Sequence, residues 1–178
     1  MISKITFLHI LTATLLIELI MLILFKFTNQ TSKAINNWYN NLKWTAVILD
    51  ILSIIIGFYI SKFIYKYLLK NNYINKDNEL IKFMFIVLII QIIHDISFYF
   101  FVIKPFPENT NLVIDEFKDY VNHYQLQAVI ADSLIYLFTT PILYYYISKN
   151  PDNTNTFISI VCTYLVGYLL HQKPLYIN

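Results

Sequence analysis

The 178-residue sequence predicts an all-α polytopic membrane helix bundle, with five transmembrane helices and two amphipathic helices at the membrane interface. Three observations predict this fold class. Hydrophobic residues make up 57% of the chain and charged residues only 13%, about half the charge of an average soluble domain. Four apolar stretches reach the length of about 20 residues that a helix needs to cross a bilayer. Two shorter segments between them carry apolar residues at helical spacing.

The spans follow from the apolar stretches and from the polar, turn-prone loops that separate them. The first four are predicted at residues 5–27, 45–65, 81–103 and 126–147, and a shorter, less apolar fifth at 156–170. Residues 1–178 therefore form a single membrane domain. Five spans place the two chain ends on opposite sides of the membrane.

The orientation is predicted from the distribution of lysine, which is the only basic residue type here apart from histidine. With the N-terminus inside, seven lysines lie inside and six outside, so the count alone decides little. The inner lysines cluster in the second loop, whereas the acidic residues Glu108, Asp115, Glu116 and Asp119 lie outside. We therefore expect the N-terminus inside, which turns the glycosylation sequon Asn29-Gln30-Thr31 outward.

Two connecting segments are predicted as amphipathic helices. In residues 33–42 the apolar positions at helical spacing are Ile35, Trp38, Tyr39 and Leu42. In residues 115–124 they are Phe117, Tyr120, Val121 and Tyr124. Such helices lie in the plane of the membrane with their aromatic rings at headgroup depth, and the lipid bilayer is their expected partner.

The two segments also correspond to each other when the chain is shifted by 82 residues. The shift aligns residues 46–52 with 128–134 in a shared AVIxDxL pattern that directly follows each amphipathic segment. We interpret this as a parallel internal repeat, with one unit at about 5–65 and the other at about 81–147, followed by the extra span. Chance similarity between apolar stretches is the alternative, and the matching surface helix argues against it.

Each of the first four predicted spans contains one acidic residue. These are Glu18, Asp50, Asp95 and Asp132. Each costs about 2.5–3.5 kcal/mol at a span centre, so together they oppose insertion by roughly 10 kcal/mol. At a rise of 1.5 Å per residue they lie about 13, 8, 12 and 9 Å from the ends that adjoin the surface helices. All four are therefore predicted in the same half of the bilayer, with Gln91 and His94 at the same depth.

The acids lie on stripes of polar or small residues at helical spacing, of which Asp50, Ser53, Gly57 and Ser61 are an example. Such stripes face neighbouring helices, and small residues on them also allow close helix packing without any further role. We expect the acids to converge inside the bundle.

Two chemical states would offset the cost of burying these acids in the membrane, and the sequence leaves both open. Protonated carboxyl groups can share hydrogen bonds, or a bound cation can be ligated by Asp50, Asp95, Asp132 and Glu18 with His94. Oxygen ligands suit calcium, magnesium or manganese, and an imidazole admits zinc or iron. The only cofactor that this pattern suggests is a divalent cation, although the spacing is not that of a strong metal motif.

Several functional classes are excluded. A net charge of +2 without a dense basic face argues against nucleic acid as a partner. The chain has no Gly-rich phosphate loop, no GxSxG and no HExxH, and the lone Cys162 forms neither an internal disulfide nor a zinc motif.

Residues 44–50, Gln91-Ile92-Ile93-His94-Asp95, Pro105, 114–120 and 128–134 together resemble an uncharacterised multi-pass membrane protein family of nucleocytoplasmic large DNA viruses. The resemblance covers about residues 38–168, and the excess of Ile, Asn, Lys and Tyr fits an AT-rich genome. It implies a viral or host-derived membrane as the location and no particular activity. The positions it singles out are Asp50, His94, Asp95, Asp115, Lys118 and Asp132.

Three functions compete at this point. The first is a component of a viral membrane, namely the membrane inside the virion, whose polar cluster fixes the bundle or its assembly. The second is a proton or metal-cation channel or transporter, expected as a homo-oligomer because one five-span bundle is narrow. The third and weakest is a membrane enzyme that uses His94 with Asp95 or Asp132 as acid and base, since no nucleophile accompanies them.

Overall fold

The computed structural model describes residues 1–28 and 33–173, and the sequon Asn29-Gln30-Thr31 lies outside them. The described residues form helices and connecting turns, with no strand. The α-helices are α1 (Phe7–Phe27), α2 (Lys33–Leu42), α3 (Trp44–Lys70), α4 (Glu79–Phe98), α5 (Leu112–Tyr124), α6 (Leu126–Tyr145) and α7 (Asp152–Leu169). Short turns of other helix types are η1 (Ile2–Lys4), the π-helical η2 (Tyr99–Ile103) and η3 (Ile147–Lys149).

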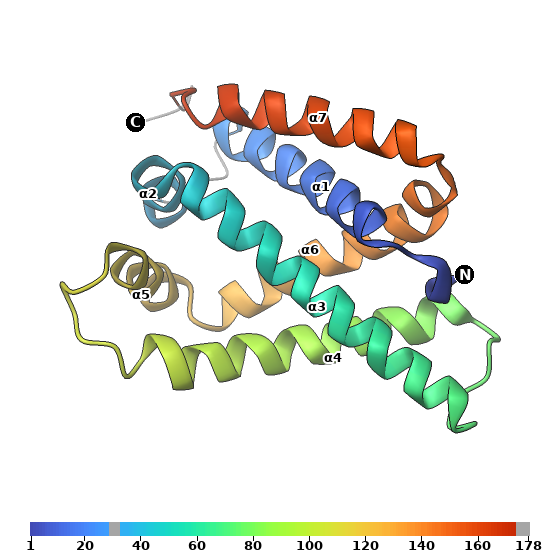
Figure 1. The fold of residues 1–178 in the computed structure, drawn as a ribbon. Helices are drawn as coiled ribbons and strands as arrows, with labels where there is room; N and C mark the ends of the chain where they lie inside the picture. The colour runs from blue at the N-terminus through green and yellow to red at the C-terminus, as the bar shows by residue number, and fades with distance from the viewer. Residues whose placement is uncertain (29–32, 174–178) are drawn as a thin grey trace.

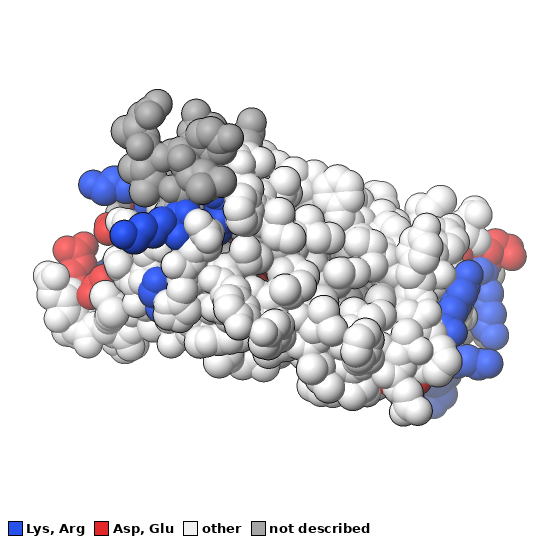
Figure 2. All heavy atoms as spheres, turned by 90° about the horizontal axis from the view of Figure 1, so that it is seen from above, with Lys and Arg blue, Asp and Glu red and all other residues white. Residues whose placement is uncertain are grey.

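Four helices in the described part of the chain are long and apolar enough to cross a membrane. They are α1, α3, α4 continued by η2, and α6 continued by η3. The first four predicted spans are thereby confirmed as apolar helices. Figure 2 shows charged side chains at the two ends of the molecule and an uncharged belt between them, as expected of a membrane protein.

The helix α1 lies beneath α7 and packs against α7, α3 and α6, while α4 packs against α3 and α6 along the opposite edge (Figure 1). Accordingly, 56% of the most apolar segment of α1 is buried inside the protein, against 17% of the corresponding segment of α4 and η2. Most of the surface of α4 therefore faces outward, where lipid would cover it.

Side-chain caps determine where two helices begin. The Thr6 hydroxyl accepts a hydrogen bond from the His9 amide at 3.4 Å, and His9 Nδ1 accepts one from the Thr6 amide at 3.1 Å. This reciprocal cap starts α1 two residues after its predicted start. The Asn111 side chain accepts from the Val113 amide at 2.9 Å, so α5 begins at Leu112 rather than at residue 115.

The two predicted surface helices are present as α2 and α5, and they pack against each other at one end of the bundle (Figure 1). The Trp38 and Phe117 rings meet edge to face with their centroids 5.7 Å apart. Each surface helix joins the following long helix through one residue of nearly the same unusual geometry. That residue is Lys43 (φ 52°, ψ −122°) in the first case and Gln125 (φ 49°, ψ −123°) in the second.

Candidate functional site

The four predicted acids lie on four different helices, near the end of the bundle that α2 and α5 cover. Glu18 belongs to α1, Asp50 to α3, Asp95 to α4 and Asp132 to α6. The structure brings them together in two groups, each of which includes side chains of neighbouring helices. We call them the Tyr39 group (Glu18, Trp38, Tyr39 and Asp50) and the Gln91 group (Gln91, His94, Asp95, Asp132 and Ser133).

In the Tyr39 group, two aromatic side chains of α2 donate hydrogen bonds to carboxylates of other helices. The Tyr39 hydroxyl lies 3.0 Å from Glu18 Oε1 and 3.1 Å from Asp50 Oδ2. The Trp38 indole nitrogen donates to the same Asp50 oxygen at 3.2 Å. Glu18 retains only 4% of its surface exposed, so the Tyr39 hydroxyl replaces water beside its carboxylate. One face of α2 is thereby tied to both α1 and α3.

The environment of Tyr39 keeps its hydroxyl in the donating form. Burial raises the pKa of Tyr39 well above its usual range, and the charges of Glu18 and Asp50 raise it further. The phenol therefore keeps its proton at neutral pH. It acts as a stable donor between the two acids.

In the Gln91 group, an amide side chain joins α4 to α6. The Gln91 amide nitrogen donates to Asp95, and its oxygen accepts from the Ser133 hydroxyl at 2.8 Å. His94 Nδ1 lies 3.2 Å from the other Asp95 oxygen. Asp132 lies close enough to Asp95 and Asp50 for their charges to interact, so the two groups adjoin.

Tyr120 of α5 lies near enough to Asp132, Asp50 and Asp95 for their charges to act on it. Burial raises the pKa of Tyr120 above its usual range, and the fields of Asp132, Asp50 and Asp95 add to the increase. Each surface helix therefore places one phenol near the carboxylates, and only that of Tyr39 bonds to them in the described structure. The sequence predicted these rings at headgroup depth, and it contained no signal for their contacts because they cross between separate helices.

The Gln91 group is more open than the Tyr39 group. The side chains of His94 and Asp95 keep 38% and 20% of their surface exposed, and Asp132 is also only half-buried. Within residues 1–28 and 33–173, no three His, Cys, Asp or Glu side chains are arranged to hold a metal ion. In this arrangement the carboxylates bond to neighbouring side chains and interact with one another through their charges.

The remaining residues singled out by the sequence lie outside both groups. Asp115 accepts a hydrogen bond from the Asn109 amide at 3.1 Å, and the Lys118 ammonium donates to the Phe106 carbonyl at 2.7 Å. Both contacts close the loop before α5. Phe117 packs against Trp38, and its ring is 5.6 Å from that of Phe98.

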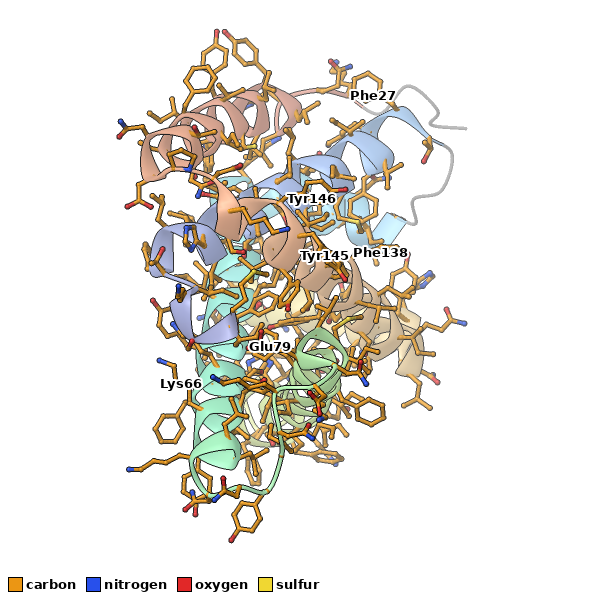
Figure 3. All side chains as sticks on the ribbon, turned by 90° about the vertical axis from the view of Figure 1, so that its right-hand side faces the viewer. Phe27, Lys66, Glu79, Phe138, Tyr145 and Tyr146 are labelled. Atoms are coloured by element: carbon orange, nitrogen blue, oxygen red, sulfur yellow. The ribbon has the colours of Figure 1, made fainter. Side chains whose placement is uncertain are left out.

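Sequence reasoning missed a polar cluster at the opposite end of the bundle. Glu79, labelled in Figure 3, accepts hydrogen bonds from the Ile2 amide at 3.1 Å and from the Tyr144 hydroxyl at 3.3 Å. Its carboxylate also pairs with the Met1 amino group at 2.6 Å. An acidic residue in the first turn of α4 was the available signal, since such positions favour negative charge.

Comparison of the chain with known protein families, with characterised proteins and with solved structures gives no match. Its function is therefore inferred from the geometry of the two groups.

Proposed function

We propose that this chain is an integral membrane protein with a structural role, in which buried carboxylates fasten the surface helices α2 and α5 to the spanning bundle. One observation carries the proposal, namely that the Tyr39 hydroxyl lies within 3.0 Å of Glu18 Oε1 and 3.1 Å of Asp50 Oδ2. A single side chain of α2 thus joins α1 and α3. Where water is scarce, such bonds offset part of the cost of burying the acids.

In this proposal α7 is the fifth span. It runs beside α1 in the same direction (Figure 1), and the Thr12 and Ser159 hydroxyl oxygens of the two helices lie 2.9 Å apart. At the far end of α7, the Lys43 ammonium donates to the Leu170 carbonyl at 3.1 Å. A helix that accompanies a spanning helix in this way lies at the same depth, even though α7 is less apolar than the other four.

We also propose that α2 with α3, and α5 with α6, are corresponding parts of a parallel internal repeat. The junction residues Lys43 and Gln125 have nearly equal dihedral angles and are 82 residues apart, the shift that aligns the two sequence patterns. Asp50 and Asp132 each follow their junction by seven residues. A non-glycine residue at positive φ is uncommon, so its recurrence at corresponding positions supports the repeat.

For the location we propose a membrane of a nucleocytoplasmic large DNA virus, either the inner membrane of the virion or a host membrane, with the N-terminus inside. The resemblance described above supports the viral origin. Lysines lie at both ends of the molecule (Figure 2), but they cluster more densely in and beside the loop between α3 and α4, which supports that end facing inward. Quantitative proteomics of purified particles should detect the protein. Its absence from them would remove the virion location.

Amide hydrogen exchange of α2 in lipid nanodiscs tests the structural role. Tyr39→Phe removes the bridging hydroxyl and keeps the ring, so we expect faster exchange across residues 33–42 than in the wild type. Tyr59→Phe is the matched control, because Tyr59 is 42% exposed on α3 and makes no hydrogen bond through its hydroxyl within the described structure. Equal exchange in the Tyr39→Phe and Tyr59→Phe variants would contradict the role.

The openness of the Gln91 group favours a second candidate function, the binding or conduction of protons or cations. His94 and Asp95 keep accessible surface at membrane depth, beside Asp132 and Asp50. Such a pathway would be built in a homo-oligomer. Proteoliposomes of the wild type should then leak cations, and Asp50→Asn combined with Asp132→Asn should abolish the leak. Equal flux in the double variant would rule out this function.

A further inference from the structure

The turn between α3 and α4 contains a hollow of about 480 Å³. It is a shallow hollow, open on one side, and four of its six lining residues are exposed. The lining residues are Leu69, Asn72, Tyr73, Ile74, Asn75 and Lys76. The hollow is remote from the carboxylate groups, since it lies at the opposite end of α3.

The shape of the hollow is fixed by hydrogen bonds on both sides. At the end of α3, Asn72 adopts a left-handed conformation with φ 58°. The Asn72 amide donates to the Leu69 carbonyl at 3.2 Å, and the Tyr73 amide donates to the Leu68 carbonyl at 3.0 Å. These two bonds form a Schellman motif, which holds the chain as it leaves the helix. From α4, the Lys82 ammonium donates to the Asn75 carbonyl at 3.3 Å. The hollow is therefore preformed by bonds within the chain.

The walls of the hollow offer donors that the chain itself does not use. The Asn72 side-chain amide, the Tyr73 hydroxyl and the Lys76 ammonium are exposed, and none of them donates a hydrogen bond to another residue that the structure describes. Leu69 and Ile74 form the apolar part of the wall and pack against the core. A ligand that fits both features has a polar anionic group joined to an apolar body.

The charge around the hollow also favours an anion. Lys66, Lys70, Lys76 and Lys82 surround the turn, and Figure 2 shows lysines gathered at this end of the molecule. The nearby Asp77 carboxylate accepts a hydrogen bond from the Asn75 side chain at 2.9 Å, which draws it toward the chain. Lysine and tyrosine directly beyond an apolar helix are typical of headgroup depth.

We propose that this hollow binds the phosphodiester headgroup of an anionic phospholipid, with Lys76 as the cationic contact and Leu69 and Ile74 against the lipid body. The proposal rests on the membrane location proposed above. It assigns a specific lipid site to one turn, rather than a general attraction of lysines to a charged surface.

Native mass spectrometry of protein released from nanodiscs of phosphatidylcholine and phosphatidylglycerol tests the site. We expect the wild type to retain phosphatidylglycerol in preference to phosphatidylcholine. Lys76→Gln should reduce this retention about fivefold, the factor that corresponds to about 1 kcal/mol for one lysine at an anionic surface. Lys66→Gln is the matched control, because Lys66 is an exposed lysine at the same end and does not line the hollow.

Four results would overturn the proposal. Equal losses in the Lys76→Gln and Lys66→Gln variants would show a diffuse attraction without a site, and a wild type without lipid preference would show no headgroup binding. Displacement of phosphatidylglycerol by inorganic phosphate alone would reassign the hollow to a free anion. A protein that fails to enter nanodiscs at all would overturn the membrane location and the lipid site together, which distinguishes the two failures.

Discussion

The close contact between α3 and α6 at Gly57 leads to a sharp prediction. A Cβ atom at Gly57 would overlap the Tyr136 hydroxyl oxygen and lie 3.0 Å from Cζ and 3.2 Å from Cε1 of the same ring, well inside van der Waals contact. The Tyr136 ring is 6% exposed and its hydroxyl donates to the Ser53 carbonyl at 3.1 Å, so it cannot move away without losing that bond. We predict that Gly57→Ala destabilises the fold.

The magnitude follows from three contributions to the free energy of unfolding, of which two lower it and one raises it. Overpacking costs about 1–3 kcal/mol, and loss of the Tyr136 hydrogen bond costs about 1 kcal/mol more. Alanine stabilises a helix interior by up to about 1 kcal/mol relative to glycine. The steric cost dominates, and we expect a net loss of about 1–3 kcal/mol.

Equilibrium unfolding in detergent micelles, followed by circular dichroism, measures this loss. Gly167→Ala is the matched control, because its Cβ would meet only Trp44 Cζ2, at 3.3 Å, and a smaller loss is expected. Tyr136→Phe removes the clashing hydroxyl and should make Gly57→Ala less costly in a double-mutant cycle. A Gly57→Ala protein as stable as the wild type, or only as impaired as Gly167→Ala, would refute the packing described here.

Two further predictions concern α7 and Tyr39. Thr12→Val removes the hydroxyl that lies 2.9 Å from Ser159 Oγ, and we expect the packing of α7 on α1 to lose about 1–3 kcal/mol of stability. Cys162 of α7 is 3% exposed, so its labelling by a maleimide should become faster. Unchanged labelling would contradict that contact. The raised pKa of Tyr39 means that the fold binds its proton more tightly than the unfolded chain does. This contribution to stability is present below the unfolded pKa of about 10 and is lost as the pH rises above it. Tyr39→Phe should therefore weaken the alkaline loss of stability, and an unchanged pH profile would contradict this reasoning.

Much of the helical architecture could be predicted from the sequence, because apolar length and helical spacing are local signals. Residues 33–42 were predicted as a surface helix and match α2. Helix ends were predicted less well. The apolar stretch at 45–65 marks only the part suited to hydrocarbon, whereas α3 continues through Lys66 to Lys70 and stops at the left-handed Asn72. Such ends depend on caps and turns rather than on hydropathy.

The candidate site could be predicted only in part. Counting residues along the helices placed Glu18 and Asp50 in the same half of the bilayer, and in the structure both lie within hydrogen-bond distance of the Tyr39 hydroxyl. Their partners could not be predicted, because amphipathic spacing identifies the packed face of α2 without showing what that face contacts. Trp38 and Tyr39 were expected as interfacial rings, yet they are 8% and 6% exposed and direct their polar atoms at carboxylates.

The fastening of α2 by the buried acids is tested most directly by an experimental density map of the protein in a lipid nanodisc. We predict that the Tyr39 hydroxyl lies between the Glu18 and Asp50 carboxylates, within hydrogen-bond distance of both. Density for an ion or a continuous water file between the two acids, with the Tyr39 ring turned away from them, would contradict this role.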